Sequence, residues 1–97
     1  MTLEEFRSSL AEQEPPDGLS TAMRALWLDA SGDWAGAHDL AGDISTSDGA
    51  LIHAYLHRKE GDLDNARYWY RQAGRAPASG SLEEEWLALV REFLAAP

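Results

Sequence analysis

The sequence predicts an all-α domain of about six helices, and three observations support this prediction. Helix caps and breakers recur along the chain, apolar residues recur at helical spacing between them, and no stretch shows sustained period-two alternation of β-branched residues. A chain of 97 residues is long enough for one hydrophobic core without disulfides or metal ions. We therefore expect a single domain over residues 1–97.

The first two helices are predicted on either side of Pro15-Pro16. Apolar residues follow one another every three or four positions before the prolines and again after them, and Gly32 ends the second stripe. We expect these helices near residues 2–13 and 18–31.

Polar caps and glycines mark the four later helices. The turn STSDG precedes the fourth helix, which Ser47 or Asp48 is expected to cap, and Gly61 closes that helix. Ser81 followed by Glu84 forms a capping box at the start of the last helix. The predicted helices lie near residues 33–44, 48–60, 62–74 and 82–95.

A repeat links the two central helix pairs. Gly32-Asp33 recurs as Gly61-Asp62, 29 residues later, and in each copy an alanine follows five positions after the glycine. Glycine permits the left-handed turn that ends one helix, aspartate caps the next helix, and alanine lets two antiparallel helices approach closely. The sequence thus predicts two similar helical hairpins, capped by the first and last helices.

The second hairpin resembles the tetratricopeptide repeat, whose second helix combines Gly-Asp, an apolar residue, alanines and an aromatic residue. The residues that carry this match are Gly61, Asp62, Leu63, Ala66, Tyr70 and Ala73. The first copy keeps Gly32, Asp33, Trp34 and Ala37 but has Ala41 at the aromatic position. Both copies lack the Trp-Leu-Gly-Tyr order of the usual first helix, and their period of 29 is shorter than the usual period of about 34.

The run HAYLHRKEGDLDNARYWYRQAGR resembles a family of small uncharacterised bacterial proteins with tetratricopeptide-like architecture, and the resemblance extends over about residues 30–90. It implies a helical-repeat fold and brings no assigned activity.

Charge and composition exclude several classes of partner. The net charge of -9 would repel a phosphate backbone, so we expect no nucleic-acid partner. No apolar run approaches the roughly 20 residues that span a bilayer, so we expect no membrane partner. The chain has no cysteine, and its first residues lack the basic start and apolar centre of a secretion signal, which together favour a cytoplasmic location.

The fifth predicted helix contains three consecutive aromatic residues, Tyr68, Trp69 and Tyr70. At about 100° per residue, Trp69 and Tyr70 share an apolar arc with Leu63, whereas Tyr68 lies on the opposite arc with the arginines. We expect an aromatic core that contains Trp34, Trp69, Tyr70, Trp86 and Phe93.

Five of the eight cations lie between residues 58 and 75, and three of them, Arg67, Arg71 and Arg75, follow at four-residue spacing. One interpretation is a solvated helix face, with Tyr68 lying over arginine stems and Asp64 offsetting one charge. The other is an interaction face made of Tyr68, Arg67, Arg71 and Arg75 that binds the carboxylates of a protein partner. The acidic first half of a second copy would suit such a face, so a homodimer is one hypothesis.

The histidines suggest a second kind of site. His53, His57 and Glu60 fall on one side of the fourth helix, and hairpin packing could bring His38 near them, so the four residues could bind a divalent metal or a small ligand. The alternative is that these histidines are hydrogen-bonded packing residues, because any two histidines four positions apart on a helix meet the same spacing.

The sequence contains no glycine-rich phosphate loop and no nucleophile elbow, and its serines cluster in turns as caps. We therefore expect that the protein is not an enzyme and that it binds no cofactor. The predicted function is a non-catalytic protein–protein interaction or scaffold module, with a metal-binding or ligand-binding domain around His38, His53, His57 and Glu60 as the alternative.

Overall fold

The computed structural model describes residues 1–95 and confirms the all-α prediction. Over these residues the chain forms six helices and no strand. The helices are α1 (Leu3–Ser9), α2 (Thr21–Ala30), α3 (Trp34–Gly42), α4 (Ser47–Lys59), α5 (Leu63–Ala73) and α6 (Leu82–Ala95).

The largest boundary error concerns α1, which was predicted to reach residue 13 and ends at Ser9. After Ser9 the backbone tightens into turns in which Leu10 and Ala11 donate to the carbonyls three residues before them. Apart from Ala11, no apolar residue lies between Leu10 and the prolines to bury another helical turn. A capping box of Thr2 and Glu5, which sequence reasoning missed, starts the helix.

The start of α4 also differs from the prediction. The N-cap residue is Thr46, which makes no side-chain capping bond, rather than Ser47 or Asp48. In the first turn the Gly49 N–H donates to the Thr46 carbonyl at 3.1 Å. Close packing requires glycine here, since a Cβ at Gly49 would lie 2.4 Å from the Ile44 carbonyl oxygen.

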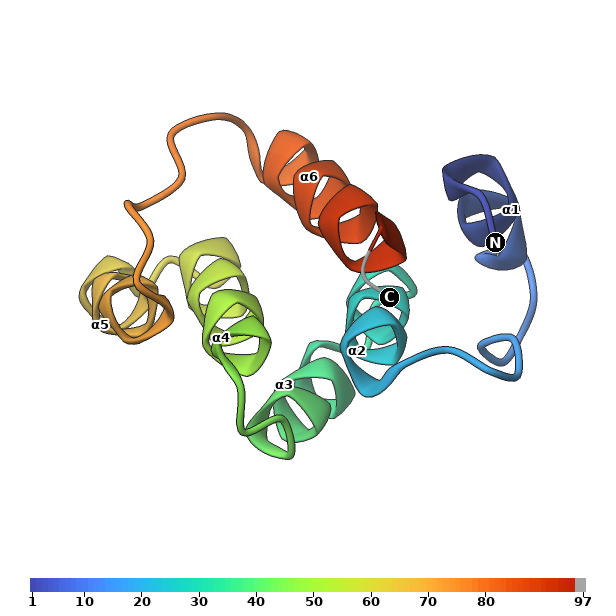
Figure 1. The fold of residues 1–97 in the computed structure, drawn as a ribbon, viewed down its shortest axis with the longest axis horizontal. Helices are drawn as coiled ribbons and strands as arrows, with labels where there is room; N and C mark the ends of the chain where they lie inside the picture. Colours follow the sequence, from blue (N-terminus) through green and yellow to red (C-terminus); the bar gives the residue numbers. More distant parts are fainter. Residues whose placement is uncertain (96–97) are drawn as a thin grey trace.

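The helices form two hairpins, α2 with α3 and α4 with α5, and α6 lies across α2 and α4 (Figure 1). The two hairpin turns have the same backbone geometry: Gly32 has φ 96° and Gly61 has φ 88°, both in the left-handed region that favours glycine. In each turn the aspartate N–H donates to the carbonyl five residues earlier, at 2.8 Å for Asp33 and 2.9 Å for Asp62. The repeat seen in the sequence is therefore a repeat of turn structure.

The core lies between the hairpins and α6, and it contains most of the expected aromatic residues. Tyr70, Trp86 and Phe93 are buried, as predicted. Phe6 of α1 packs against Trp86 with ring centroids 5.9 Å apart, which brings α1 onto the same core. Trp27, which sequence reasoning did not place in the core, is also buried.

Three residues of the predicted apolar set are less buried than expected. Trp34 and Trp69 are only partly buried, and Leu63 is 52% exposed. Leu63 and Trp69 are less buried because, within residues 1–95, the backbone of α5 lies close to that of α4 and of no other helix, which leaves much of its surface open to solvent. Trp34 lies at the start of α3, where its indole Nε1 donates to the Leu56 carbonyl at 2.9 Å.

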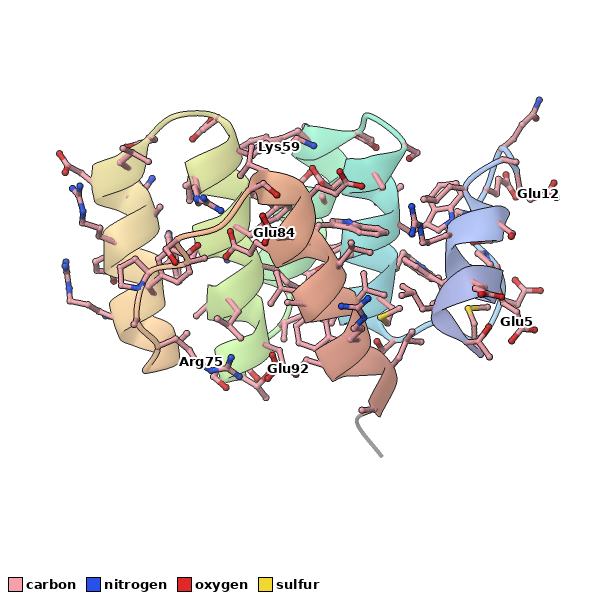
Figure 2. The ribbon with its side chains drawn as sticks, turned by 90° about the horizontal axis from the view of Figure 1, so that it is seen from above. Glu5, Glu12, Lys59, Arg75, Glu84 and Glu92 are labelled. Atoms are coloured by element: carbon pink, nitrogen blue, oxygen red, sulfur yellow. The ribbon has the colours of Figure 1, made fainter. Side chains whose placement is uncertain are left out.

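Two buried carboxylates connect the helices. Asp29 of α2 is 2% exposed and accepts hydrogen bonds from the Tyr55 hydroxyl and from Lys59 Nζ, each at 2.9 Å. Figure 2 shows Lys59 at the end of α4 that faces α2. Glu85 of α6 accepts from Arg58 at 3.0 Å and from the Tyr70 hydroxyl. These bonds hold α2 and α6 against the α4–α5 hairpin.

The burial pattern predicts different stability effects at two tryptophans. Trp86→Ala should lower the free energy of unfolding by about 3 to 5 kcal/mol, because it removes a buried ring and leaves a cavity. Trp69→Ala should cost only about 1 to 2 kcal/mol, since water can reach the site of the missing ring. Urea titration measures both values, and an equal loss for the two variants would contradict this assignment.

Candidate functional site

The three histidines of the chain come together between the two hairpins. His38 extends from α3, and His53 and His57 extend from α4. The His38 ring contacts the other two edge to face, with centroid distances of 4.8 Å to His53 and 5.2 Å to His57. The predicted gathering of His38 with His53 and His57 is thus present in the structure.

Two tryptophans enclose this histidine cluster. Trp34 of α3 stacks on His38 with centroids 5.0 Å apart, and Trp69 of α5 stacks on His53 at 4.2 Å. Trp69 also contacts Tyr68 edge to face at 5.2 Å. The aromatic rings therefore form a continuous layer across α3, α4 and α5, and this layer joins the histidine cluster to the predicted interaction face.

Hydrogen bonds fix the two buried histidines of α4. His53 Nδ1 donates to the Gly49 carbonyl at 3.0 Å, one turn earlier in the same helix. His57 Nδ1 donates to Glu60 Oε1 at 2.7 Å. In both rings Nδ1 carries the proton, because its partner is a carbonyl or carboxylate oxygen that only accepts.

Burial lowers the pKa of His53, and the neighbouring His38 and His57 lower it further, against the opposing effect of the Gly49 carbonyl. The neutral imidazole is therefore the form that fits the packed cluster. A hollow of ≈ 400 Å³ lies beside His53 and Trp69, and the turn between α3 and α4 forms its other wall.

The structure groups the possible metal ligands differently from the sequence prediction. His57 and Glu60 do lie together, as their spacing indicated. The side chain that completes a group of three is Asp62: single ligand atoms of His57, Glu60 and Asp62 all lie within 4.8 Å of one another. Within residues 1–95 no other set of three His, Asp or Glu side chains meets this limit, so His38 and His53 contact His57 through their rings without sharing such a site with it.

Sequence reasoning had given Asp62 only a capping role. It does cap α5, accepting from the Asn65 N–H at 3.3 Å. The signal that was overlooked is its position two residues after Glu60, across a glycine turn that folds the chain back toward His57.

Two of the three arginines at four-residue spacing on α5 and just beyond it form ion pairs. Arg67 bonds Asp64 at 2.7 Å, as the sequence suggested, and Arg75 pairs with Glu92 of α6 (Figure 2). The pairing of Arg75 with Glu92 was not predicted, because helix spacing alone does not show where α6 lies. Arg71 makes no ion pair within the described part of the chain.

Tyr68 is exposed as predicted, with 46% of its surface accessible. Its ring rests against Trp69, and Asp64 bonds Arg67. The surface around Tyr68 therefore combines an exposed phenol, the partly exposed edge of an indole and one unpaired guanidinium among the residues that the structure describes. We call Arg67, Tyr68, Trp69 and Arg71 the α5 face.

Comparisons with protein families, curated proteins and solved structures found no match to this chain. Among the described residues, no helix combines the length and apolar character required to span a membrane.

The packing of His53 predicts a pH dependence of stability. Its pKa in the folded chain lies below the ordinary value of 6.5, so the unfolded chain binds more protons when the pH falls below that value. The free energy of unfolding should therefore decrease as the pH drops from 6.5 toward the folded pKa. His53→Asn keeps an N–H for the Gly49 carbonyl but cannot be protonated, so it should lose less stability than the wild type between about pH 7.5 and 5.5.

Urea titrations of both proteins at each pH measure this difference. Parallel losses in the two proteins would assign the pH dependence to groups other than His53.

Proposed function

We propose that this chain is a non-catalytic protein–protein interaction module of tetratricopeptide-like architecture, and that it works in the cytoplasm. Its contact surface is the α5 face. The repeated hairpin turn supports the architecture, and the absence of cysteine supports the location. The observation that carries the proposal is the exposed Tyr68, held against Trp69, beside a guanidinium without an ion-pair partner in residues 1–95.

The chemistry of the α5 face is that of a contact surface. Tyrosine, tryptophan and arginine are enriched in protein interfaces, where rigid rings provide contact area at a low entropic cost. Tyr68 gains this rigidity from the edge-to-face contact with Trp69. Arg71 forms no ion pair with a carboxylate of the described residues, so a carboxylate of an acidic partner could pair with it.

The partner that the chain itself offers is a second copy. α5 and α1 lie at opposite ends of the long axis (Figure 1). The α1 end is acidic: Glu5 and Glu12 point outward there (Figure 2). Docking the α5 face of one copy on the α1 end of the next would be a head-to-tail contact, which joins two different surfaces.

The net charge of -9 opposes this contact at long range. Ions at about 0.1 M reduce the Debye length to about 10 Å, well below the 34 Å length of the molecule. At that salt concentration the distant like charges are screened, whereas a guanidinium and a carboxylate in contact still attract. Association should therefore be strongest near about 0.1 M salt and should weaken at about 1 M.

Arg71→Glu should abolish this self-association, because it places a carboxylate opposite the acidic α1 end. Arg24→Glu is the matched control: Arg24 is also exposed, has no ion pair within residues 1–95, and lies on α2. Arg75 is unsuitable for the test, since reversing its charge would also break the bond to Glu92. Sedimentation equilibrium over a concentration series measures the association constant of each variant.

Tyr68→Ala should weaken association without changing its salt dependence. Two results would contradict the α5 face as the contact surface. One is a wild-type chain that stays monomeric near about 0.1 M salt, and the other is an Arg24→Glu variant that loses association as fully as Arg71→Glu.

A further inference from the structure

We propose that the turn between α4 and α5 binds one divalent transition-metal ion of the Zn²⁺ class through His57, Glu60 and Asp62. These side chains bring one nitrogen and two carboxylate oxygens within 4.8 Å of one another. One imidazole and two carboxylates are ligand types that first-row divalent ions accept. The inference is independent of the α5 face, because none of the three residues belongs to that surface.

The first hairpin turn provides an internal comparison. It has the same glycine conformation, the same aspartate cap and the same backbone bond as the second turn. At the positions that correspond to His57 and Glu60, 29 residues earlier, it carries Leu28 and Ser31. The turn therefore forms equally well without an imidazole or a glutamate, so its backbone geometry does not account for His57 and Glu60.

Two polar side chains approach His57 Nδ1. Glu60 Oε1 lies 2.7 Å from Nδ1, and Asn65 Nδ2 lies 3.5 Å from it. A single Nδ1–H cannot both donate to Glu60 and accept from the Asn65 amide. A half-turn of that amide would place Oδ1 in this position, where it would be a further oxygen ligand.

For His57 and Glu60, metal binding requires only a small change in separation, whereas Asp62 starts within 4.8 Å of both and must move closer to share the ion. An ion about 2.0 to 2.1 Å from both Nδ1 and a carboxylate oxygen separates these two atoms by roughly 2.9 to 3.3 Å, a few tenths of an ångström more than the observed distance. The Nδ1 proton must leave or move to Nε2, so that Nδ1 presents its lone pair to the ion. Because Glu60 and Asp62 are exposed, water can fill the remaining coordination positions of the ion.

The competing explanation is that Glu60 serves only as a hydrogen-bond partner that satisfies His57 at the end of α4. That role needs no ion and no contribution from Asp62. The two explanations therefore differ in two predictions. Only the metal site predicts that the chain binds zinc, and only the metal site predicts that the Asp62 carboxylate contributes something beyond capping α5.

Zinc chloride titrated into the untagged chain, followed by calorimetry and by the melting temperature, distinguishes them. We expect one Zn²⁺ per chain and a melting temperature that rises with zinc concentration. Mg²⁺ should give no comparable response, because it prefers an octahedral shell of oxygen ligands and water.

Three single variants test the ligands. Two of them copy the residue that the first turn has at the same position, and the third keeps a helix-capping side chain. His57→Leu and Glu60→Ser introduce the residues of the first turn, and Asp62→Ser keeps an N-cap hydroxyl for α5 while removing the carboxylate. Each should weaken zinc binding by about tenfold or more. Asp33→Ser makes the same cap replacement in the first turn and should leave zinc binding unchanged.

If His57→Leu fails to fold, the exposed positions Glu60 and Asp62 still decide the question. Absence of zinc binding to the wild-type chain would overturn the proposal. Unchanged zinc binding in both Glu60→Ser and Asp62→Ser would also overturn it, and a loss of binding in His38→Ala or His53→Ala instead would place the ion in the histidine cluster.

Discussion

The burial of α4 on every side is the constraint on which the rest of the structure depends. Residues 49–57 are all buried, and α4 packs against α2, α3, α5 and α6. An ordinary amphipathic helix turns its polar side chains toward water, but α4 has no water-facing side over this stretch. Its polar side chains must therefore find partners in the protein, since an unpaired buried polar group is strongly destabilising.

These partners explain how the neighbouring helices are oriented around α4. The Tyr55 hydroxyl bonds Asp29 of α2, and burial followed by the charge of Asp29 raises the pKa of Tyr55, so that it stays a donor. Arg58, near the end of α4, bonds Glu85 of α6. His53 is satisfied within α4 itself and presents its ring to Trp69 of α5. Each of these contacts involves a different neighbour, so the side chains of α4 orient α2, α5 and α6 around it.

Local signals predicted the helices well, and long-range packing explains what they missed. Glycine turns and aspartate caps act within a few residues, so Gly61 and Asp62 located the second hairpin correctly. Helical periodicity assigns one buried face to each helix, so it could not show that α4 is buried all round or that Leu63 is exposed. Those outcomes depend on how many helices pack on each one, which is a property of the tertiary structure.

The same distinction applies to the candidate sites. Spacing on one helix correctly placed His57 beside Glu60, whereas Asp62 joined them through the turn and Arg75 met Glu92 through the docking of α6. Part of the concentration of cations in the second half of the chain therefore has a structural role, because Arg58 and Lys59 pair with buried carboxylates of α6 and α2. The exposed residues that this role leaves unexplained, above all Arg71 and Tyr68, are consequently more informative about function than the total charge.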